Sequence, residues 1–181
     1  SVQYSAPVWL VATLIEEYGQ ERAEAILASL FIRNKASVRV TDSSKVDELA
    51  QALSAEKSDL SPVGLVKASG HFAGSQAFKE GLITIQDETS QLVAPTLQLE
   101  GWEEVLDACA APGGKTCHIA SYLTSGQVTA LDLYDHKLTL IEENAHRLGL
   151  ANRVKTQKLD ACQVAETFGP DRFDKILVDA P

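Results

Sequence analysis

The residues best suited to chemistry form a run of small side chains near the middle of the sequence, Leu106–Thr116. Val105 and Leu106 predict a short buried strand before it, and Thr116–Leu123 predicts a helix after it. Between them lies the pair Gly113–Gly114, and glycines let a backbone approach a ligand because they have no Cβ. A strand, a tight turn and a helix in this order are typical of an open α/β sheet that binds a nucleotide-like ligand.

The turn permits two kinds of ligand. Gly114-Lys115-Thr116 matches the end of a phosphate-binding loop, but that motif also needs a glycine where Cys109 stands. Pro112 lacks a backbone N–H that such a loop would use. The sequence therefore disfavours a phosphate loop and favours a site for S-adenosylmethionine, with the amino-acid end of the cofactor over the turn.

A cofactor of this kind also needs an acidic residue for its ribose at the end of the next strand. Gln127–Leu131 predicts that strand, and Asp132 follows it. Asp132 taken alone fits equally well a carboxylate that starts the helix predicted over Tyr134–Leu148. The glycine turn that precedes it favours the ribose role.

The run Asp107-Ala-Cys-Ala-Ala-Pro-Gly-Gly-Lys-Thr116 resembles motif I of the Nol1/Nop2/Sun family of RNA cytosine-5 methyltransferases. The resemblance extends from about Ser5 to Pro181 and is strongest to the bacterial Sun (RsmB-type) branch, which acts on 16S ribosomal RNA. It implies a Rossmann-like α/β methyltransferase sheet, S-adenosylmethionine as the cofactor, and ribosomal RNA as the substrate. The reaction that it implies is methylation of a cytosine at carbon 5.

The resemblance also implies roles for single residues. Asp132 would bind the ribose hydroxyls, and Asp160 would bind the adenine, although a turn aspartate is the alternative for Asp160. Asp179 would lie near the methyl-transfer site, and Lys115 could orient the base or the carboxylate. The methionine end of the cofactor would lie on the residues of the turn: Cys109, Ala110, Ala111, Pro112, Gly113, Gly114 and Lys115.

Asp179-Ala-Pro181 resembles the start of the family's motif IV, which continues with a cysteine. In the family that cysteine assists product release, and another one, after the next strand, attacks carbon 6 of the cytosine. Such covalent catalysis divides one difficult step into two easier ones. Cys109, Cys117 and Cys162 match neither position, so we expect no catalytic residue in this chain and a nucleophile beyond Pro181.

The chain is therefore expected to be a fragment that holds the cofactor-binding half and is inactive alone. Two other functions remain open. One is a non-enzymatic RNA-binding module that retains cofactor binding, and the other is a nucleotide hydrolase built on Gly114-Lys115-Thr116.

The order of elements predicts two domains. Residues 1–84 form a small α/β domain, which the resemblance likens to an RNA-recognition fold, and residues 85–181 form the first half of the methyltransferase sheet. Strands and helices alternate after the turn, which indicates a parallel sheet covered by helices. The remaining expected elements are helices over 5–18, 21–30, 44–53 and 88–99, strands over 37–41 and 64–68, and a strand with a turn over 81–87. Trp9, Leu10, Leu14 and Ile15 are expected on the buried face of the first helix, and Leu92, Val93, Thr96 and Leu99 on one face of the fourth.

The formal net charge of −9 argues against a general nucleic-acid coat, although a local basic face remains compatible with it. Arg33, Lys35 and Arg39 gather near the first predicted strand. They are candidates for contacts with RNA phosphates, but charges that guard a solvated edge strand are the favoured interpretation for any one of them.

The remaining composition is ordinary for a cytoplasmic protein. No apolar run approaches the length of a membrane span. The three cysteines include no Cys-x-x-Cys pair, so neither a disulfide framework nor a metal site is indicated. We expect reduced thiols, no metal and a monomer.

Overall fold

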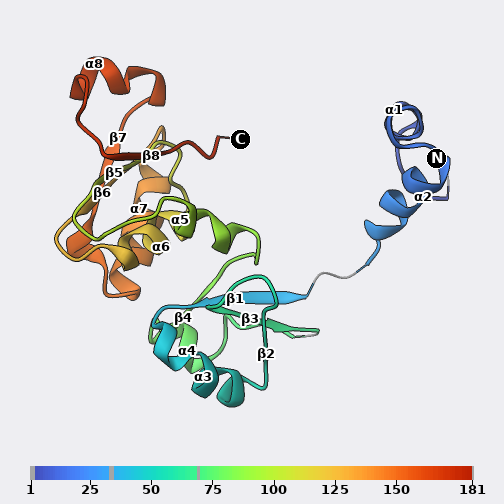
Figure 1. The fold of residues 1–181 in the computed structure, drawn as a ribbon, viewed down its shortest axis with the longest axis horizontal. Helices are drawn as coiled ribbons and strands as arrows, with labels where there is room; N and C mark the ends of the chain where they lie inside the picture. Colours follow the sequence, from blue (N-terminus) through green and yellow to red (C-terminus); the bar gives the residue numbers. More distant parts are fainter. Residues whose placement is uncertain (1–2, 33–34, 69, 181) are drawn as a thin grey trace. The chain divides into compact units, whose positions relative to one another are not determined.

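A computed structural model describes residues 3–32, 35–68 and 70–180. The chain divides into two compact units, Ser1–Lys35 and Ala36–Pro181, and each unit is described by itself. Figure 1 shows the order of helices and strands along the chain. No helix in the described ranges is both long enough and apolar enough to cross a membrane.

The first unit consists of helices α1 (Val8–Tyr18) and α2 (Gln20–Ser29), which pack against each other around Gly19. The expected buried face of α1 is only partly present: Leu10 and Leu14 are half-buried, whereas Trp9 is 68% exposed and Ile15 is 42% exposed. In α2, Ala23 and Leu27 are the buried residues. Two short helices enclose too little volume to bury a complete apolar face.

The second unit begins with a 4-stranded antiparallel sheet in the order β2-β3-β1-β4. A 3₁₀ turn (Ser43–Lys45) and helices α3 (Val46–Leu53) and α4 (Gln76–Lys79) accompany it. Its core includes Val38, Leu65 and Ile83, with Leu49 of α3 packed among them. The strands are β1 (Ala36–Val40), β2 (Glu56–Lys57), β3 (Gly64–Lys67) and β4 (Ile83–Ile85).

A second 4-stranded sheet follows, in the order β7-β6-β5-β8, and all its pairings are parallel. This confirms the predicted α/β class and the parallel sheet. Its strands are β5 (Glu104–Asp107), β6 (Gln127–Asp132), β7 (Val154–Lys158) and β8 (Lys175–Leu177). Its helices are α5 (Val93–Thr96), α6 (Gly114–Tyr122), α7 (Asp135–Arg147) and α8 (Val164–Phe168). Shorter 3₁₀ turns cover Ser90–Leu92, Ala151–Arg153 and Ala161–Gln163.

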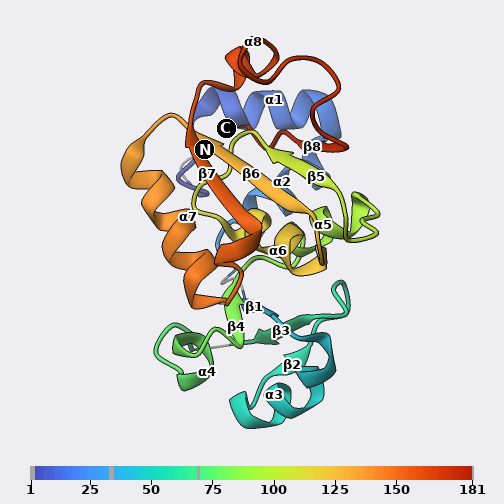
Figure 2. The ribbon, with the colours of Figure 1, turned by 90° about the vertical axis from the view of Figure 1, so that its left-hand side faces the viewer.

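Alternate residues of β5 face opposite layers of the parallel sheet, which Figure 2 shows between its helices. Val105 packs in the cluster that contains Ile119 of α6 and Ala145 of α7. Leu106 packs with Val164 and Phe168 of α8. The period of two along the strand thus places helices on both faces, as in other doubly wound sheets.

The chain leaves β5 toward β6 and β7, and then returns to the other side of β5 as β8. Such a reversal opens a crevice at the carboxyl ends of the strands, where ligands of open α/β sheets bind. The residues that follow β5 and β8 therefore lie at the mouth of this crevice.

The predicted helix over 88–99 is wrong in extent and in its buried face. The structure has a 3₁₀ turn over Ser90–Leu92 and a single α-helical turn over Val93–Thr96. Gln91 and Ala94 are buried, whereas Leu92 is 38% exposed. Pro95 offers no backbone N–H to a longer helix, and packing against α6 selects the face.

Candidate functional site

The turn after β5 is held tightly from beneath. Ala110 N–H donates to the carbonyl of Leu131 at 2.9 Å, and Gly113 N–H donates to the carbonyl of Ala110 at 2.7 Å. Asn144 of α7 donates to the Pro112 carbonyl at 2.8 Å. The turn is thus tied to β6 and α7, and it delivers the chain directly into the first turn of α6.

Gly113 is needed for packing. Its φ is +98°, and a Cβ there would lie 3.1 Å from the Cα of Ile141 in α7. Of the two glycines, Gly114 lines a cavity and Gly113 does not. A ligand could therefore approach the backbone closely at Gly114 but not at Gly113.

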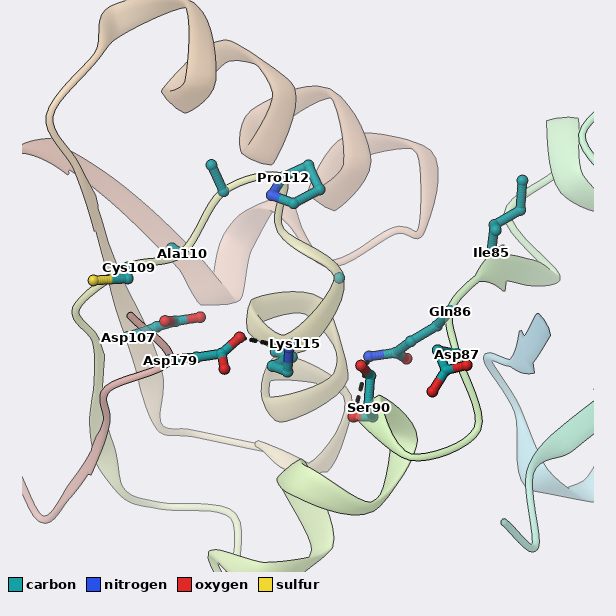
Figure 3. Close-up of a pocket in the computed structure, with 12 residues that line it drawn as sticks. Ile85, Gln86, Asp87, Ser90, Asp107, Cys109, Ala110, Pro112, Lys115 and Asp179 are labelled. Atoms are coloured by element: carbon teal, nitrogen blue, oxygen red, sulfur yellow. Dashed lines mark hydrogen bonds and ion pairs between the residues drawn. The ribbon is translucent and has the colours of Figure 1, made fainter. Parts of the chain in front are cut away.

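A cavity of about 190 Å³, which we name the bend cavity, opens over this turn (Figure 3). The turn contributes Cys109, Ala110, Ala111, Pro112, Gly114 and Lys115; the strand ends contribute Asp107 and Asp179; and the segment after β4 contributes Ile85, Gln86, Asp87 and Ser90. The cavity therefore unites most of the predicted cofactor residues with a segment to which the sequence assigned no ligand.

Lys115 and Asp179 form an ion pair across the bend cavity, with 2.5 Å between Nζ and Oδ2 (Figure 3). The Lys115 side chain is 25% exposed and that of Asp179 is 52% exposed. The pair joins the first turn of α6 to the end of β8, and it faces the space where a ligand would lie.

Asp107 is the most deeply buried acid in the bend cavity, with only 1% of its surface exposed. Oδ2 accepts a hydrogen bond from the Thr116 hydroxyl at 2.7 Å, and no partner for Oδ1 occurs among the described residues. Burial raises the pKa of the Asp107 carboxyl to about 6, while the Thr116 hydrogen bond opposes that rise. A buried acceptor without a partner is costly in a finished fold, and a ligand that donates to it in the bend cavity would remove that cost.

A second cavity of about 330 Å³, the Asp132 cavity, adjoins the first through Cys109. Asp132 ends β6 with a side chain that is 10% exposed, and its Oδ1 accepts from the Tyr134 N–H and lies 3.8 Å from Lys137 Nζ. Asp160 lines the same cavity, and its Oδ1 accepts from the Cys162 N–H at 2.9 Å. Both aspartates thus accept backbone hydrogen bonds, as the helix-start and turn interpretations of the sequence predicted. Both also line the Asp132 cavity.

Cys109 lies between the two cavities, and its surroundings suit a neutral thiol. Burial raises its pKa, and the nearby carboxylates of Asp107, Asp132, Asp179 and Asp160 raise it further. Cys117 is completely buried, and burial raises its pKa to about 11. Neither side chain is set up as a thiolate nucleophile, because nucleophilic cysteines have lowered pKa values.

Arg39 overturns both interpretations that the sequence offered for it. It lies on β1, between β3 and β4, and is only 1% exposed, so it neither guards an edge nor faces RNA. Burial lowers its pKa to about 10. Lys35 is exposed, and Arg33 lies outside the described residues. Arg39 is buried because β1 lies inside its sheet, and this strand order depends on pairing between distant segments.

In the part of the chain that the structure describes, no group of His, Cys, Asp and Glu side chains could hold a metal ion.

A family profile for 16S rRNA methyltransferase RsmB/F matches residues 94–181. The probable ribosomal RNA small subunit methyltransferase B of Bacillus subtilis is 42% identical over the whole of this chain, which spans 42% of that protein.

Residues 94–181 thus match the RsmB/F methyltransferase family, and the whole chain is similar to a methyltransferase of that name.

Solved structures agree with this fold. PH0851 aligns with a TM-score of 0.88 at 31% identity, over 99% of this chain and 42% of that one. NSun6 from Pyrococcus horikoshii, solved with SFG, aligns with a TM-score of 0.85 at 20% identity, over 97% of this chain and 70% of that one. The latter likeness shows the fold alone.

Asp107 and Gln86 line the bend cavity but were not among the site residues predicted from sequence. Asp107 stands at the carboxyl end of a buried strand, which is itself a usable signal. Gln86 carries no such signal, because its place in the bend cavity depends on the packing of the first sheet beside the turn.

Proposed function

We propose that this chain is the cofactor-binding part of an enzyme that methylates carbon 5 of a cytosine in small-subunit ribosomal RNA, with S-adenosylmethionine as methyl donor. The observation that carries the proposal is the pair of adjoining cavities at the strand ends, in a chain whose residues 94–181 match the RsmB/F family. One cavity suits an amino-acid group and the other a nucleoside. The chain spans 42% of its Bacillus subtilis relative, so the activity proposed is that of the whole protein.

The residues present suit this cofactor. Asp107 offers an unpartnered carboxylate oxygen to an ammonium group at the bend cavity. The turn Cys109–Lys115, including Ala110, Ala111, Pro112, Gly113 and Gly114, would hold the methionine end. Asp132 would accept from the ribose hydroxyls and Asp160 from the adenine amino group. The turn leads into the N-terminus of α6, and helix N-termini bind anionic groups such as a carboxylate.

When bound, the cofactor supplies an electrophilic methyl group on a sulfonium. Lys115 and Asp179, which pair across the bend cavity, would orient the cytosine ring through hydrogen bonds. A cysteine beyond Pro181 would add to carbon 6 of the ring, which makes carbon 5 nucleophilic. After methyl transfer a base removes the carbon 5 proton, and the cysteine leaves as the double bond re-forms. The target base must leave its stack to reach the cavity.

Calorimetry on this chain tests the cofactor. We expect S-adenosylhomocysteine to bind and ATP with magnesium to show no heat. ATP binding without S-adenosylhomocysteine binding would instead support the nucleotide hydrolase, which the matched methyltransferase family disfavours.

A second assay tests the reaction on the complete gene product. Ribosomal RNA labelled with tritium at carbon 5 of cytosine should release tritium to water as methyl groups are incorporated, because the carbon 5 proton is replaced. Methyl transfer without tritium release would place the methyl group elsewhere, and no transfer at all would favour the inactive RNA-binding module. A ribosomal substrate also implies that the enzyme works in the bacterial cytoplasm.

A further inference from the structure

Gln86 follows β4 and reaches the bend cavity with a firmly held backbone. Its carbonyl accepts from the Ser37 hydroxyl at 2.8 Å and from Gln91 Nε2 at 3.0 Å. Only 7% of its surface is exposed. The two hydrogen bonds fix the peptide, so the side chain enters the cavity from a defined point.

Arg39 fixes which end of the Gln86 amide faces the cavity. Arg39 Nε donates to Gln86 Oε1 at 2.9 Å, within the buried interior of the first sheet. A guanidinium only donates hydrogen bonds, so the amide oxygen must face Arg39 and the amide nitrogen must face away from it. An inverted amide would place two donors against each other in a buried setting, which is costly.

The amide nitrogen of Gln86 is directed toward the first turn of α6 (Figure 3). It lies 3.9 Å from the place that a Cβ on Gly114 would occupy, and it makes a long contact of 3.4 Å with the Ser90 carbonyl. One of its two hydrogens is therefore available to a ligand. The backbone N–H groups of a first helical turn also lack partners within the helix.

The bend cavity thus has donors on one side and a free acceptor on the other. The donors are Gln86 Nε2 and the first turn of α6, and the acceptor is Asp107 Oδ1. An α-amino acid group carries a carboxylate and an ammonium on one carbon, and this arrangement matches both.

We infer that Gln86 donates a hydrogen bond to the carboxylate of the cofactor's methionine end, and that Arg39 is a positioning residue that orients the Gln86 amide. The inference rests on the proposed function, because it assigns a residue to the same cofactor.

Two ligands separate this role from a general structural one. S-adenosylhomocysteine carries the amino-acid group, whereas 5′-methylthioadenosine lacks it and keeps the adenosine. In calorimetry, Gln86→Leu should weaken S-adenosylhomocysteine binding about tenfold, since a hydrogen bond to a charged group is lost. Its affinity for 5′-methylthioadenosine should stay unchanged. Gln51→Leu, an exposed change on α3, is the matched control and should alter neither affinity.

Two further variants test the orientation. Gln86→Glu keeps the shape and the Arg39 contact but offers no donor, so it should lose at least as much S-adenosylhomocysteine affinity as Gln86→Leu. Arg39→Gln leaves the Gln86 amide free to invert, and it should weaken S-adenosylhomocysteine selectively by about threefold, as a partial loss of that hydrogen bond.

Unchanged S-adenosylhomocysteine affinity in both Gln86 variants would overturn the inference, as would equal losses for the two ligands. If the unmodified chain binds neither ligand, the proposed function itself fails.

Discussion

At the scale of single residues, Asp107 is the group whose chemistry depends most on its surroundings. Burial raises its pKa to about 6, and one of its oxygens lacks a partner among the described residues. The carboxylate is charged at neutral pH but kept from water. Groups held in this way are common at functional sites, where a ligand completes their hydrogen bonding.

The affinity for S-adenosylhomocysteine should depend on the protonation of Asp107. The ligand's ammonium pairs with the carboxylate and not with the neutral acid, so affinity should fall as the pH is lowered through about 6. Calorimetry at several pH values from about 5 to about 8, on both sides of that pKa, measures this affinity change. Asp107→Asn should bind more weakly at pH 8 and show a flat profile. A profile that stays steep in the variant would assign the titration to another group.

The effect of Asp107 on protein stability should have the opposite pH dependence: stability should fall as the pH rises. Its pKa is raised in the folded state from 3.8 to about 6, so the native state binds more protons between these values and stability falls as pH rises through that window. The loss amounts to roughly 3 kcal/mol at most. Asp107→Asn should therefore be more stable than the unmodified chain above that window, as denaturant unfolding at two pH values would show. Equal stability of both proteins above the window would contradict this.

Asp132→Ala should weaken S-adenosylhomocysteine binding by about an order of magnitude or more, because a hydrogen bond to a charged group is worth about 1.5–3 kcal/mol. Asp135→Ala is the control, since Asp135 is exposed and pairs with Lys158 outside the cavity. Unchanged affinity in calorimetry would remove Asp132 from the ribose role.

At the scale of elements, the packing of α7 against the first sheet connects the two sheets of the second unit. Arg147, the last residue of α7, donates to the carbonyls of Phe78 and Ile83 and stacks on the Phe78 ring at 4.1 Å. The backbone of Gly81, with a φ of +73°, lies against the backbone of Arg147. The backbones approach so closely that a side chain has no room.

Gly81→Ala should destabilise the protein far more than Gly149→Ala. A Cβ on Gly81 would lie 2.0 Å from the Arg147 carbonyl oxygen, whereas a Cβ on Gly149 would meet nothing within 4 Å. Both glycines have a similar positive φ, +73° and +71°, so the conformational cost of about 1–2 kcal/mol is shared. Thermal unfolding of both variants measures the difference, and equal losses would show that the close contact relaxes without cost.

For the molecule as a whole the formal net charge is −9, and some of its acidic residues lie at the candidate cofactor site. Four aspartates surround Cys109 there, and the ion pairs found among the described residues provide only Lys115 and Lys137 against them. The site is therefore suited to a cationic donor. The acidic composition, which disfavours a general RNA coat, is compatible with a methyltransferase whose cofactor is positively charged.

Cationic cofactors should bind more tightly than the neutral product at low salt. S-adenosylmethionine and sinefungin carry a positive charge at the reacting position, and S-adenosylhomocysteine does not. Raising the salt from about 0.01 M to 1 M shortens the screening length from about 30 Å to 3 Å, so the affinity difference should narrow. Calorimetry at both concentrations measures this, with 5′-methylthioadenosine as the neutral control. Identical salt dependence for all ligands would show that the carboxylates of the site exert no net electrostatic attraction on the cofactor.

The parallel sheet, the turn after β5 and the positions of Asp132, Asp160 and Asp179 after strands could be predicted from the amino-acid sequence. These features depend on periodicity and turn chemistry within a few neighbouring residues, which the sequence displays directly. The boundary expected between residues 84 and 85 and the monomeric state remain predictions.

The burial of Arg39 and the position of Gln86 at the bend cavity could not be predicted from the sequence. These residues are 47 positions apart in the chain, and they meet because β1 lies in the middle of its sheet and β4 beside it. Likewise, Gly113 is required by a helix that begins at Asp135. Strand order and the burial of a charge arise from contacts between distant segments, and no local pattern in the sequence encodes them.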